Sequence, residues 1–270
     1  VFHPASLNVK HIQSQAPGIG ESDRIYTDNG SDIILAGQAD DWILAYNQTA
    51  DQTDALGNGD RDIVLGDNGY ASFDSAEVIT VIESTATDIG GNDQIFVGNG
   101  PDIVVGGYGT DLVNVALPTT ATAFAVAFDP FELTIDGQPT DPHSLLDGTD
   151  IGADLVLGDN GRIVFHVGHQ RVDTITTTAP GDGSIDLIYT DAGPDMVLGG
   201  TDSDWILTHN PANNDADPDV VFGDNGNADF DLDVVSLTEI VRELSSTDYA
   251  IGNNDVILTG NGADLVIGGA

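Results

Sequence analysis

The sequence predicts an all-β fold, a flattened solenoid of short parallel strands with inserted hairpins or loops. Aspartate returns every nine residues, as at Asp23, Asp32 and Asp41, and each precedes three or four apolar residues, such as IIL at 33–35. Apolar runs this short favour strands over helices. Glycine, asparagine and serine between the runs suit tight turns. Two strands and two turns make one coil, and its apolar face is buried only when coils stack.

The nine-residue period lies within a larger repeat. Three pairs of segments align: 1–47 on 164–210, 61–74 on 218–231, and 90–107 on 252–269. The first pair has 23 identities in 47 positions without a gap. We therefore interpret residues 1–163 as a first super-repeat and residues 164–270 as a second, incomplete one. Neither end has the composition of a capping coil, so we expect the native polypeptide to continue past both ends or the chains to associate end to end.

Longer segments interrupt the period. Those at 70–90, 162–183 and 227–252 each follow a GDNG sequence. Alternation such as EVITVIE predicts strands or a projecting hairpin, whereas SLTEIVREL (236–244) allows one short helix. The largest insertion, 114–150, contains AFAVAFDPFELTIDG and predicts two alternating strands.

One turn carries a specific motif. Residues 106–114, GGYGTDLVN, follow the spacing G-G-x-G-x-D-x-U-x, and this nonapeptide resembles the calcium-binding repeat of the RTX (repeats-in-toxin) family. Neighbouring copies are degenerate: GGTDSDWIL (199–207) lacks the third glycine, and AGQADDWIL (36–44) has alanine at two glycine positions. The resemblance covers about half of the chain and excludes the insertions and GDNG. It implies a parallel β-roll or β-helix solenoid with Ca²⁺ ions between the turns of adjacent coils.

The same resemblance implies a set of ligands for several calcium ions. Ca²⁺ takes six to eight oxygens from carboxylates, carbonyls and water, and glycine turns can direct carbonyls to it. Eleven candidates stand at nine-residue spacing: Asp23, Asp32, Asp41, Asp93, Asp102, Asp111, Asp186, Asp195, Asp204, Asp255 and Asp264. Three further copies, each before an apolar run that leads into GDNG, are Asp62, Asp154 and Asp219, and all fourteen are called the nine-residue aspartates below. Further candidates within the turns are Asp28, Asp40, Asp191 and Asp202. Turns nine residues apart should lie on opposite sides, so Asp23 and Asp41 should share a side that Asp32 does not.

Two alternatives remain open for these aspartates. Asp and Asn also favour turns through local hydrogen bonds, with no metal involved. The number of aspartates in register and the net charge of −39 favour cation binding for the nine-residue set. In the GDNG sequences, an Asx-turn and a calcium ligand are equally good interpretations for Asp67, Asp159 and Asp224.

Composition limits the possible partners. There are 45 Asp and Glu against six Lys and Arg, which argues against nucleic acid and against anionic membrane surfaces. No apolar run is long enough for membrane insertion. Cysteine is absent, so disulfides and thiolate metal sites are excluded. Such a charge predicts that folding requires bound cations.

Two functions from different classes are compatible with these features. Because the whole 163-residue unit repeats, the leading hypothesis is a calcium-binding structural module of a long extracellular protein, such as an adhesin stalk, a surface layer or a filament. Its partners would be calcium ions and further repeats of the same protein, outside the cell or on its surface. The alternative is a folding and secretion module of a secreted hydrolase or polysaccharide epimerase. We expect no catalytic residues in this chain, because no nucleophile motif or zinc-type His pair stands beside the repeats.

Overall fold

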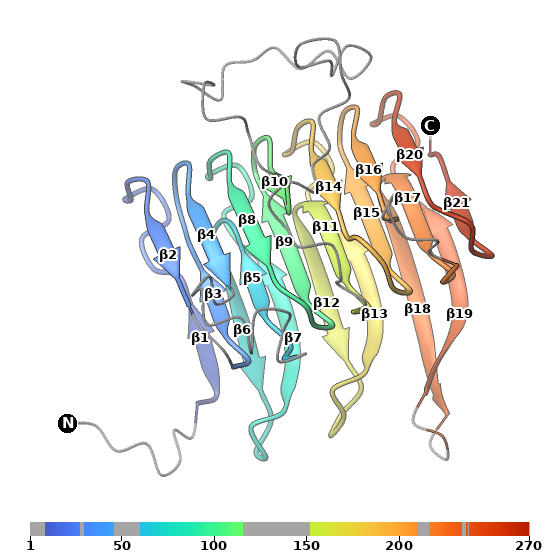
Figure 1. The fold of residues 1–270 in the computed structure, drawn as a ribbon. Helices are drawn as coiled ribbons and strands as arrows, with labels where there is room; N and C mark the ends of the chain where they lie inside the picture. The colour runs from blue at the N-terminus through green and yellow to red at the C-terminus, as the bar shows by residue number, and fades with distance from the viewer. Residues whose placement is uncertain are drawn as a thin grey trace, which may run out of the picture.

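The computed structural model describes residues 9–27, 30–45, 60–115, 152–209, 216–233, 236 and 238–269. In these ranges the regular structure consists of twenty-one β-strands and no helix (Figure 1). The strands form three seven-stranded sheets, two parallel and one antiparallel. The predicted all-β class and the predicted parallel strands are therefore confirmed.

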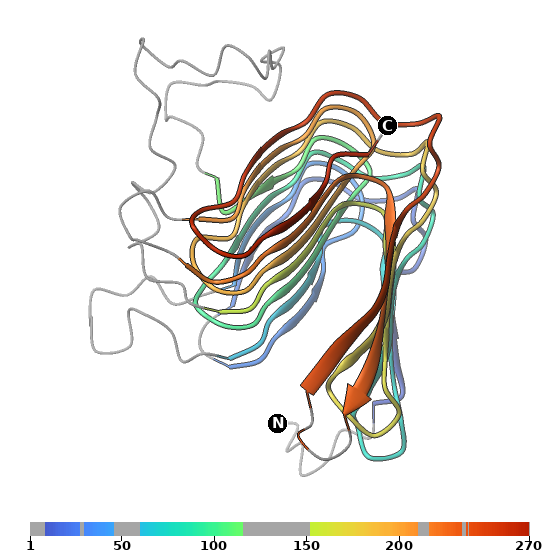
Figure 2. The same cartoon turned by 90° about the vertical axis from the view of Figure 1, so that its right-hand side faces the viewer.

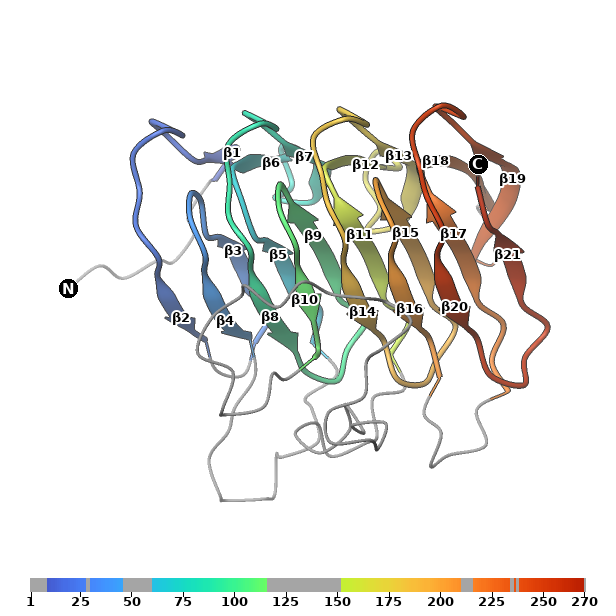
Figure 3. The same ribbon diagram turned by 90° about the horizontal axis from the view of Figure 1, so that it is seen from above.

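The two parallel sheets alternate along the chain. The outer sheet contains, in order, β2 (Arg24–Tyr26), β4 (Trp42–Ala45), β8 (Gln94–Val97), β10 (Leu112–Val113), β14 (Leu187–Tyr189), β16 (Trp205–Leu207) and β20 (Val256–Leu258). The central sheet contains β3 (Ile33–Leu35), β5 (Ile63–Leu65), β9 (Ile103–Gly107), β11 (Leu155–Asp159), β15 (Met196–Gly200), β17 (Val220–Asp224) and β21 (Leu265–Ile267). Seen from above, the strands of both sheets follow one another along the same axis of the molecule (Figure 3).

One register rule holds throughout both parallel sheets. The residue that follows each nine-residue aspartate pairs with its counterpart on the next strand, as Arg24 does with Trp42 and Ile33 does with Ile63. The rule holds even where long segments separate the strands, as between Leu112 and Leu187. The aspartates themselves are therefore brought into two rows.

The GDNG sequences lead into the hairpin sheet. It contains β1 (His11–Gln13), β6 (Gly69–Phe73), β7 (Ile79–Ser84), β12 (Gly161–Phe165), β13 (Val172–Thr177), β18 (Gly226–Asp233) and β19 (Thr238–Ser246), all paired antiparallel. The hairpins predicted after GDNG are present. The short helix allowed for 236–244 is wrong, because residues 238–244 belong to strand β19, which pairs with β18.

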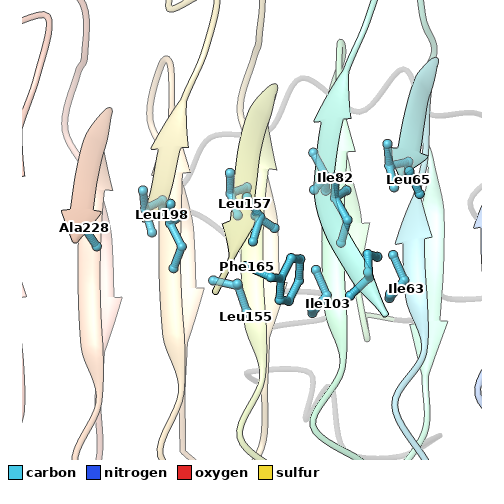
Figure 4. Packing of buried hydrophobic residues seen from close by; sticks show 14 of the residues in the cluster. Ile63, Leu65, Ile82, Ile103, Leu155, Leu157, Phe165, Leu198 and Ala228 are labelled. Carbon is cyan, nitrogen blue, oxygen red and sulfur yellow. The ribbon is translucent and has the colours of Figure 1, made fainter. Parts of the chain in front are cut away.

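The three sheets form successive layers with the central sheet in the middle, as the view along the stack shows (Figure 2). Alternate side chains of a central strand face opposite ways. Val64 packs in a cluster with outer-sheet residues such as Ile95. Ile63 and Leu65 pack in a second cluster with hairpin-sheet residues such as Ile82 (Figure 4). The central strands are thus covered on both faces, which explains their continuous apolar runs.

The boundary between the super-repeats is not a break in the sheets. Residue 163 lies within β12, and β10 pairs with β14 across it. The two strands predicted within the 114–150 insertion lie outside the described residues, except for its first two positions.

Candidate functional site

The nine-residue aspartates form two hydrogen-bonded ladders, one beside each parallel sheet. In the outer ladder, the backbone N–H of each aspartate donates to Oδ1 of the next one at 2.6–3.0 Å. Its members are Asp23, Asp41, Asp93, Asp111, Asp186, Asp204 and Asp255. The ladder arises because each aspartate directly precedes a strand held in constant register.

The central ladder repeats this pattern at the start of the central strands. Its N–H to Oδ1 distances are 2.8–3.2 Å. Its members are Asp32, Asp62, Asp102, Asp154, Asp195, Asp219 and Asp264. Asp23 and Asp41 are therefore neighbours in one ladder and Asp32 belongs to the other, as the RTX resemblance implies.

The second carboxylate oxygen, Oδ2, takes no part in the bonds of either ladder, and it is buried in members of both, including Asp102 and Asp154 of the central ladder. In the outer ladder, Oδ2 is buried and has no hydrogen-bond partner in six members: Asp41, Asp93, Asp111, Asp186, Asp204 and Asp255. In the central ladder, the Thr190 hydroxyl donates to Asp195 Oδ2 at 2.5 Å, and the Thr208 hydroxyl donates to Asp219 Oδ2 at 2.6 Å. Buried polar atoms without partners are rare in native proteins and often mark a missing ion or water.

Glycines at the ends of the central strands make room for the unpartnered oxygens. A Cβ on Gly66 would approach both Asp93 Oδ2 and the Gly106 carbonyl oxygen to less than 3.0 Å, so only glycine fits there. We call this arrangement of a glycine, an Oδ2 and the next glycine carbonyl a cradle. Five cradles recur along the stack, at Gly66 with Asp93, Gly106 with Asp111, Gly158 with Asp186, Gly199 with Asp204, and Gly223 with Asp255.

Each cradle therefore brings oxygen atoms of two kinds close to one glycine. The carboxylate oxygen comes from the turn that follows the glycine, and the carbonyl oxygen comes from the next central strand, as at Gly158 and Gly199. Ala36 stands where Gly106 stands in the RTX-like motif, so this glycine position is not kept before Asp41. The cradle glycines were not singled out from the sequence, although a glycine follows nearly every central run.

Burial makes the ionised form of these carboxyl groups costly. It raises the pKa of Asp41 and Asp255 to about 6. It also raises the pKa of Asp93, Asp111 and Asp186 well above the usual value, and neighbouring carboxylates raise it further. A buried anion of this kind needs either a proton or a cation close by.

The GDNG aspartates are arranged differently, because backbone N–H groups of other turns bind them. Asp67 accepts from Gly91 N–H on Oδ1 at 3.0 Å and from Tyr108 N–H on Oδ2 at 2.6 Å. Asp159 accepts in the same way from Ser184 and Thr201 at 3.1 and 2.5 Å. These carboxylates clamp two turns together, a role that the sequence does not predict.

Asp224 of the third GDNG sequence, and the asparagine of each GDNG sequence, also form hydrogen bonds with other segments of the chain. Asp224 accepts from Asn253 N–H at 3.2 Å. The side-chain amides donate to carbonyls of other segments: Asn68 to Ile89, Asn160 to Asp182, and Asn225 to Gly200. Asp67 lies deep enough for burial to raise its pKa to about 9.

The remaining candidates are scattered within turns. Asp40 Oδ1 accepts from Asn92 N–H at 2.9 Å, and Asp202 Oδ1 accepts from the Asn253 side chain at 2.8 Å. Asp191 is buried, and its positive φ of 69° matches a turn position. Asp28 lies outside the described residues. In the described part of the chain, no three His, Asp or Glu side chains converge on one point, so a metal would need backbone oxygens as well.

Comparison of the chain with protein-family models, with curated proteins and with solved structures finds no match. Within the described ranges, no helix has the length and apolar character that a membrane crossing requires.

Proposed function

We propose that the chain is a calcium-binding structural module, folded as a parallel β-roll solenoid of the RTX type. The single register shared by all strands of both parallel sheets supports the solenoid, because each coil then repeats the one before it. The resemblance of residues 106–114 to the RTX nonapeptide agrees with this architecture.

The observation that carries the proposal is the row of unpartnered Oδ2 atoms in the cradles. The polar atoms nearest to each cradle glycine are acceptors, a carboxylate oxygen and a carbonyl oxygen, so together they would attract a cation. The set matches the hard oxygen ligands that Ca²⁺ prefers, with water completing the shell. Mg²⁺ is a poorer fit because it requires a tighter octahedral shell and dehydrates reluctantly.

The proposed ligands are Oδ2 of Asp93, Asp111, Asp186, Asp204 and Asp255, together with the glycine carbonyls that face them. The central ladder is a weaker candidate for calcium binding at positions where a threonine hydroxyl already donates to Oδ2, as at Asp195. The GDNG aspartates are assigned to the clamps instead. Calcium in the cradles would supply the positive charge that six basic residues cannot supply.

A structural role follows from where the cradles lie. Each one joins atoms of successive coils, so a bound ion would stiffen the stack along its length. Extracellular calcium sites have dissociation constants of about 10⁻⁴–10⁻³ M, which suits a chain that folds outside the cell and stays unfolded within it. We therefore propose a secreted or cell-surface location and a non-catalytic role.

A calcium titration tests the proposal. Far-UV circular dichroism should show a disordered chain in excess EGTA and a cooperative β spectrum in millimolar Ca²⁺, with Mg²⁺ a poor substitute. Isothermal titration should detect loss of one ion in Asp111→Asn and no loss in Glu77→Gln, which removes an exposed charge on a hairpin turn. A β fold that persists unchanged in EGTA at low ionic strength would contradict the proposal.

A further inference from the structure

The asparagine of each GDNG sequence precedes a glycine, and Asn–Gly pairs of an unfolded chain deamidate spontaneously, because glycine has no Cβ to hinder its backbone nitrogen. That nitrogen attacks Cγ of the asparagine, ammonia leaves with the nitrogen's proton, and a succinimide ring forms. Water then opens the ring to aspartate or to isoaspartate, whose backbone runs through the side-chain carbon. The three pairs are Asn68–Gly69, Asn160–Gly161 and Asn225–Gly226.

In the folded chain, both reacting groups of these pairs are held in other hydrogen bonds. The three asparagines are at most 3% exposed, and their amides donate to carbonyl oxygens of other segments. The glycine nitrogens donate to hydroxyl oxygens at 2.9–3.1 Å, in the pairs Gly69 with Ser14, Gly161 with Ser84, and Gly226 with Thr177. Attack on Cγ would break both bonds at a buried position, so the folded state should block the reaction.

The protecting hydroxyl comes from the preceding hairpin strand in all three cases. Ser84 ends β7, which pairs with β12, and Thr177 ends β13, which pairs with β18. Ser14 directly follows β1, which pairs with β6. These strands lie side by side in the hairpin sheet (Figure 1). A GDNG pair is therefore protected only after its hairpin has docked on the one before it.

We propose that the three GDNG asparagines are deamidation sites that folding closes, and that deamidation at any of them prevents later folding. The Asn160 amide donates to the Asp182 carbonyl at 2.7 Å and to the Thr87 carbonyl at 3.1 Å. A carboxylate there would set buried negative oxygens against two acceptors. Isoaspartate would also lengthen the backbone by one atom directly before β12 and disturb its register. Neither step requires calcium in the cradles.

Peptide mapping by mass spectrometry measures the protection. Folded protein in millimolar Ca²⁺ and unfolded protein in guanidinium chloride are incubated at the same mildly alkaline pH. The three asparagines should convert at least about tenfold more slowly in the folded protein, because local opening has to precede the reaction. Equal rates in the two samples would overturn the protection. A third sample in EGTA separates this result from the proposed function, because a chain that folds without calcium should keep its amides there.

Refolding of the aged chains tests the second half of the proposal. Protein aged in guanidinium chloride at mildly alkaline pH is diluted into Ca²⁺, and size exclusion isolates the folded fraction. That fraction should carry amides at all three GDNG positions, whatever has happened at other asparagines, and the deamidated chains should remain unfolded. A sample aged in guanidinium chloride at mildly acidic pH, where the glycine nitrogen reacts slowly, should refold fully. Aspartate or isoaspartate at GDNG positions in the folded fraction, in the proportion present before refolding, would overturn the proposal.

A matched pair of variants isolates the charge from the rearranged backbone. Asn160→Asp imitates one product and should unfold at a lower guanidinium concentration than the wild type, or fail to fold. Asn92→Asp adds the same charge in a turn where the side-chain oxygen already accepts from Thr110 N–H at 2.8 Å. Asp40 holds the equivalent position one coil earlier and accepts in the same way from Asn92 N–H. Asn92→Asp should therefore keep the wild-type midpoint, and a wild-type midpoint for Asn160→Asp would refute the block to folding.

Discussion

Replacing Asp186 with asparagine separates the two tasks of an outer-ladder carboxylate. Asparagine keeps an Oδ1 that can accept from Asp111 N–H, so the ladder can persist. Its Nδ2 would replace the buried, unpartnered Oδ2 in the cradle of Gly158. A cation would lose an anionic ligand there, while the calcium-free chain would lose a buried charge. The variant should therefore be less stable than the wild type in calcium and more stable without it.

The size of the effect follows from the number of cradles. Five ions bound only by the folded state would make the free energy of unfolding rise by about 7 kcal/mol per tenfold increase in free Ca²⁺, and four ions by about 5.5 kcal/mol. For a dissociation constant of about 10⁻⁴ M, one site contributes about 2.7 kcal/mol at 10 mM Ca²⁺. Losing it is a large fraction of the ordinary stability of a domain.

Urea unfolding at a series of free calcium concentrations, followed by far-UV circular dichroism, measures this slope. The Asp186→Asn curve should be shallower than the wild-type curve by one ion and should cross it at low calcium. Glu77→Gln removes one exposed charge and should keep the wild-type slope. Equal slopes for Asp186→Asn and the wild type would refute the cradle as a cation site, even if the variant were destabilised.

Three further outcomes are expected. Without calcium, the folded chain binds more protons than the unfolded one, because burial raises the pKa of Asp41 to about 6 and that of Asp67 to about 9. Stability is then full below about pH 4 and is lost as pH rises through 6 toward 9, so calcium-stripped protein should show more β structure at pH 4 than at pH 8. Asp67→Asn would set an amide donor against a backbone N–H and should lower stability by about 1–3 kcal/mol even in saturating calcium, measured by urea unfolding. Gly158→Ala, whose Cβ would fill the Asp186 cradle, should remove one ion in isothermal titration, whereas Gly181→Ala, with open space around its Cβ, should remove none.

Local sequence patterns predict the strands of the two parallel sheets, and the RTX resemblance implies the two rows of aspartates. The nine-residue spacing puts Asp23 and Asp41 two strands apart, and alternation between the parallel sheets then places both on the same side. Local patterns cannot identify the hydrogen-bond partner of each aspartate, because the two residues of a pair are far apart in the sequence. Asp111 N–H, for example, donates to a carboxylate 75 residues away. Only the tertiary register shows that one carboxylate oxygen is already used by the backbone.

The two differences from expectation have physical causes of the same kind. Residues 236–244 contain good helix formers, but pairing with β18 overrides their propensity, and Arg242 binds Asp229 across the strands at 3.1 Å. For Asp67, the short GDNG turn suggested a local hydrogen bond or a metal. In the structure this carboxylate joins two distant turns, because the hairpin that follows GDNG brings the chain back beside it.

The geometry of the outer ladder explains why folding and the proposed cation binding would be inseparable. The bond from Asp41 N–H fixes Asp93 Oδ1, and this fixes where Asp93 Oδ2 lies. The cradle around that oxygen needs Gly66 on one central strand and the Gly106 carbonyl on the next. No cradle is therefore complete until two successive coils have stacked, and a bound ion would stabilise only the stacked state. Aspartate suits this position because it offers one oxygen to the backbone and a second, charged one to the ion, whereas asparagine and serine offer only one of the two.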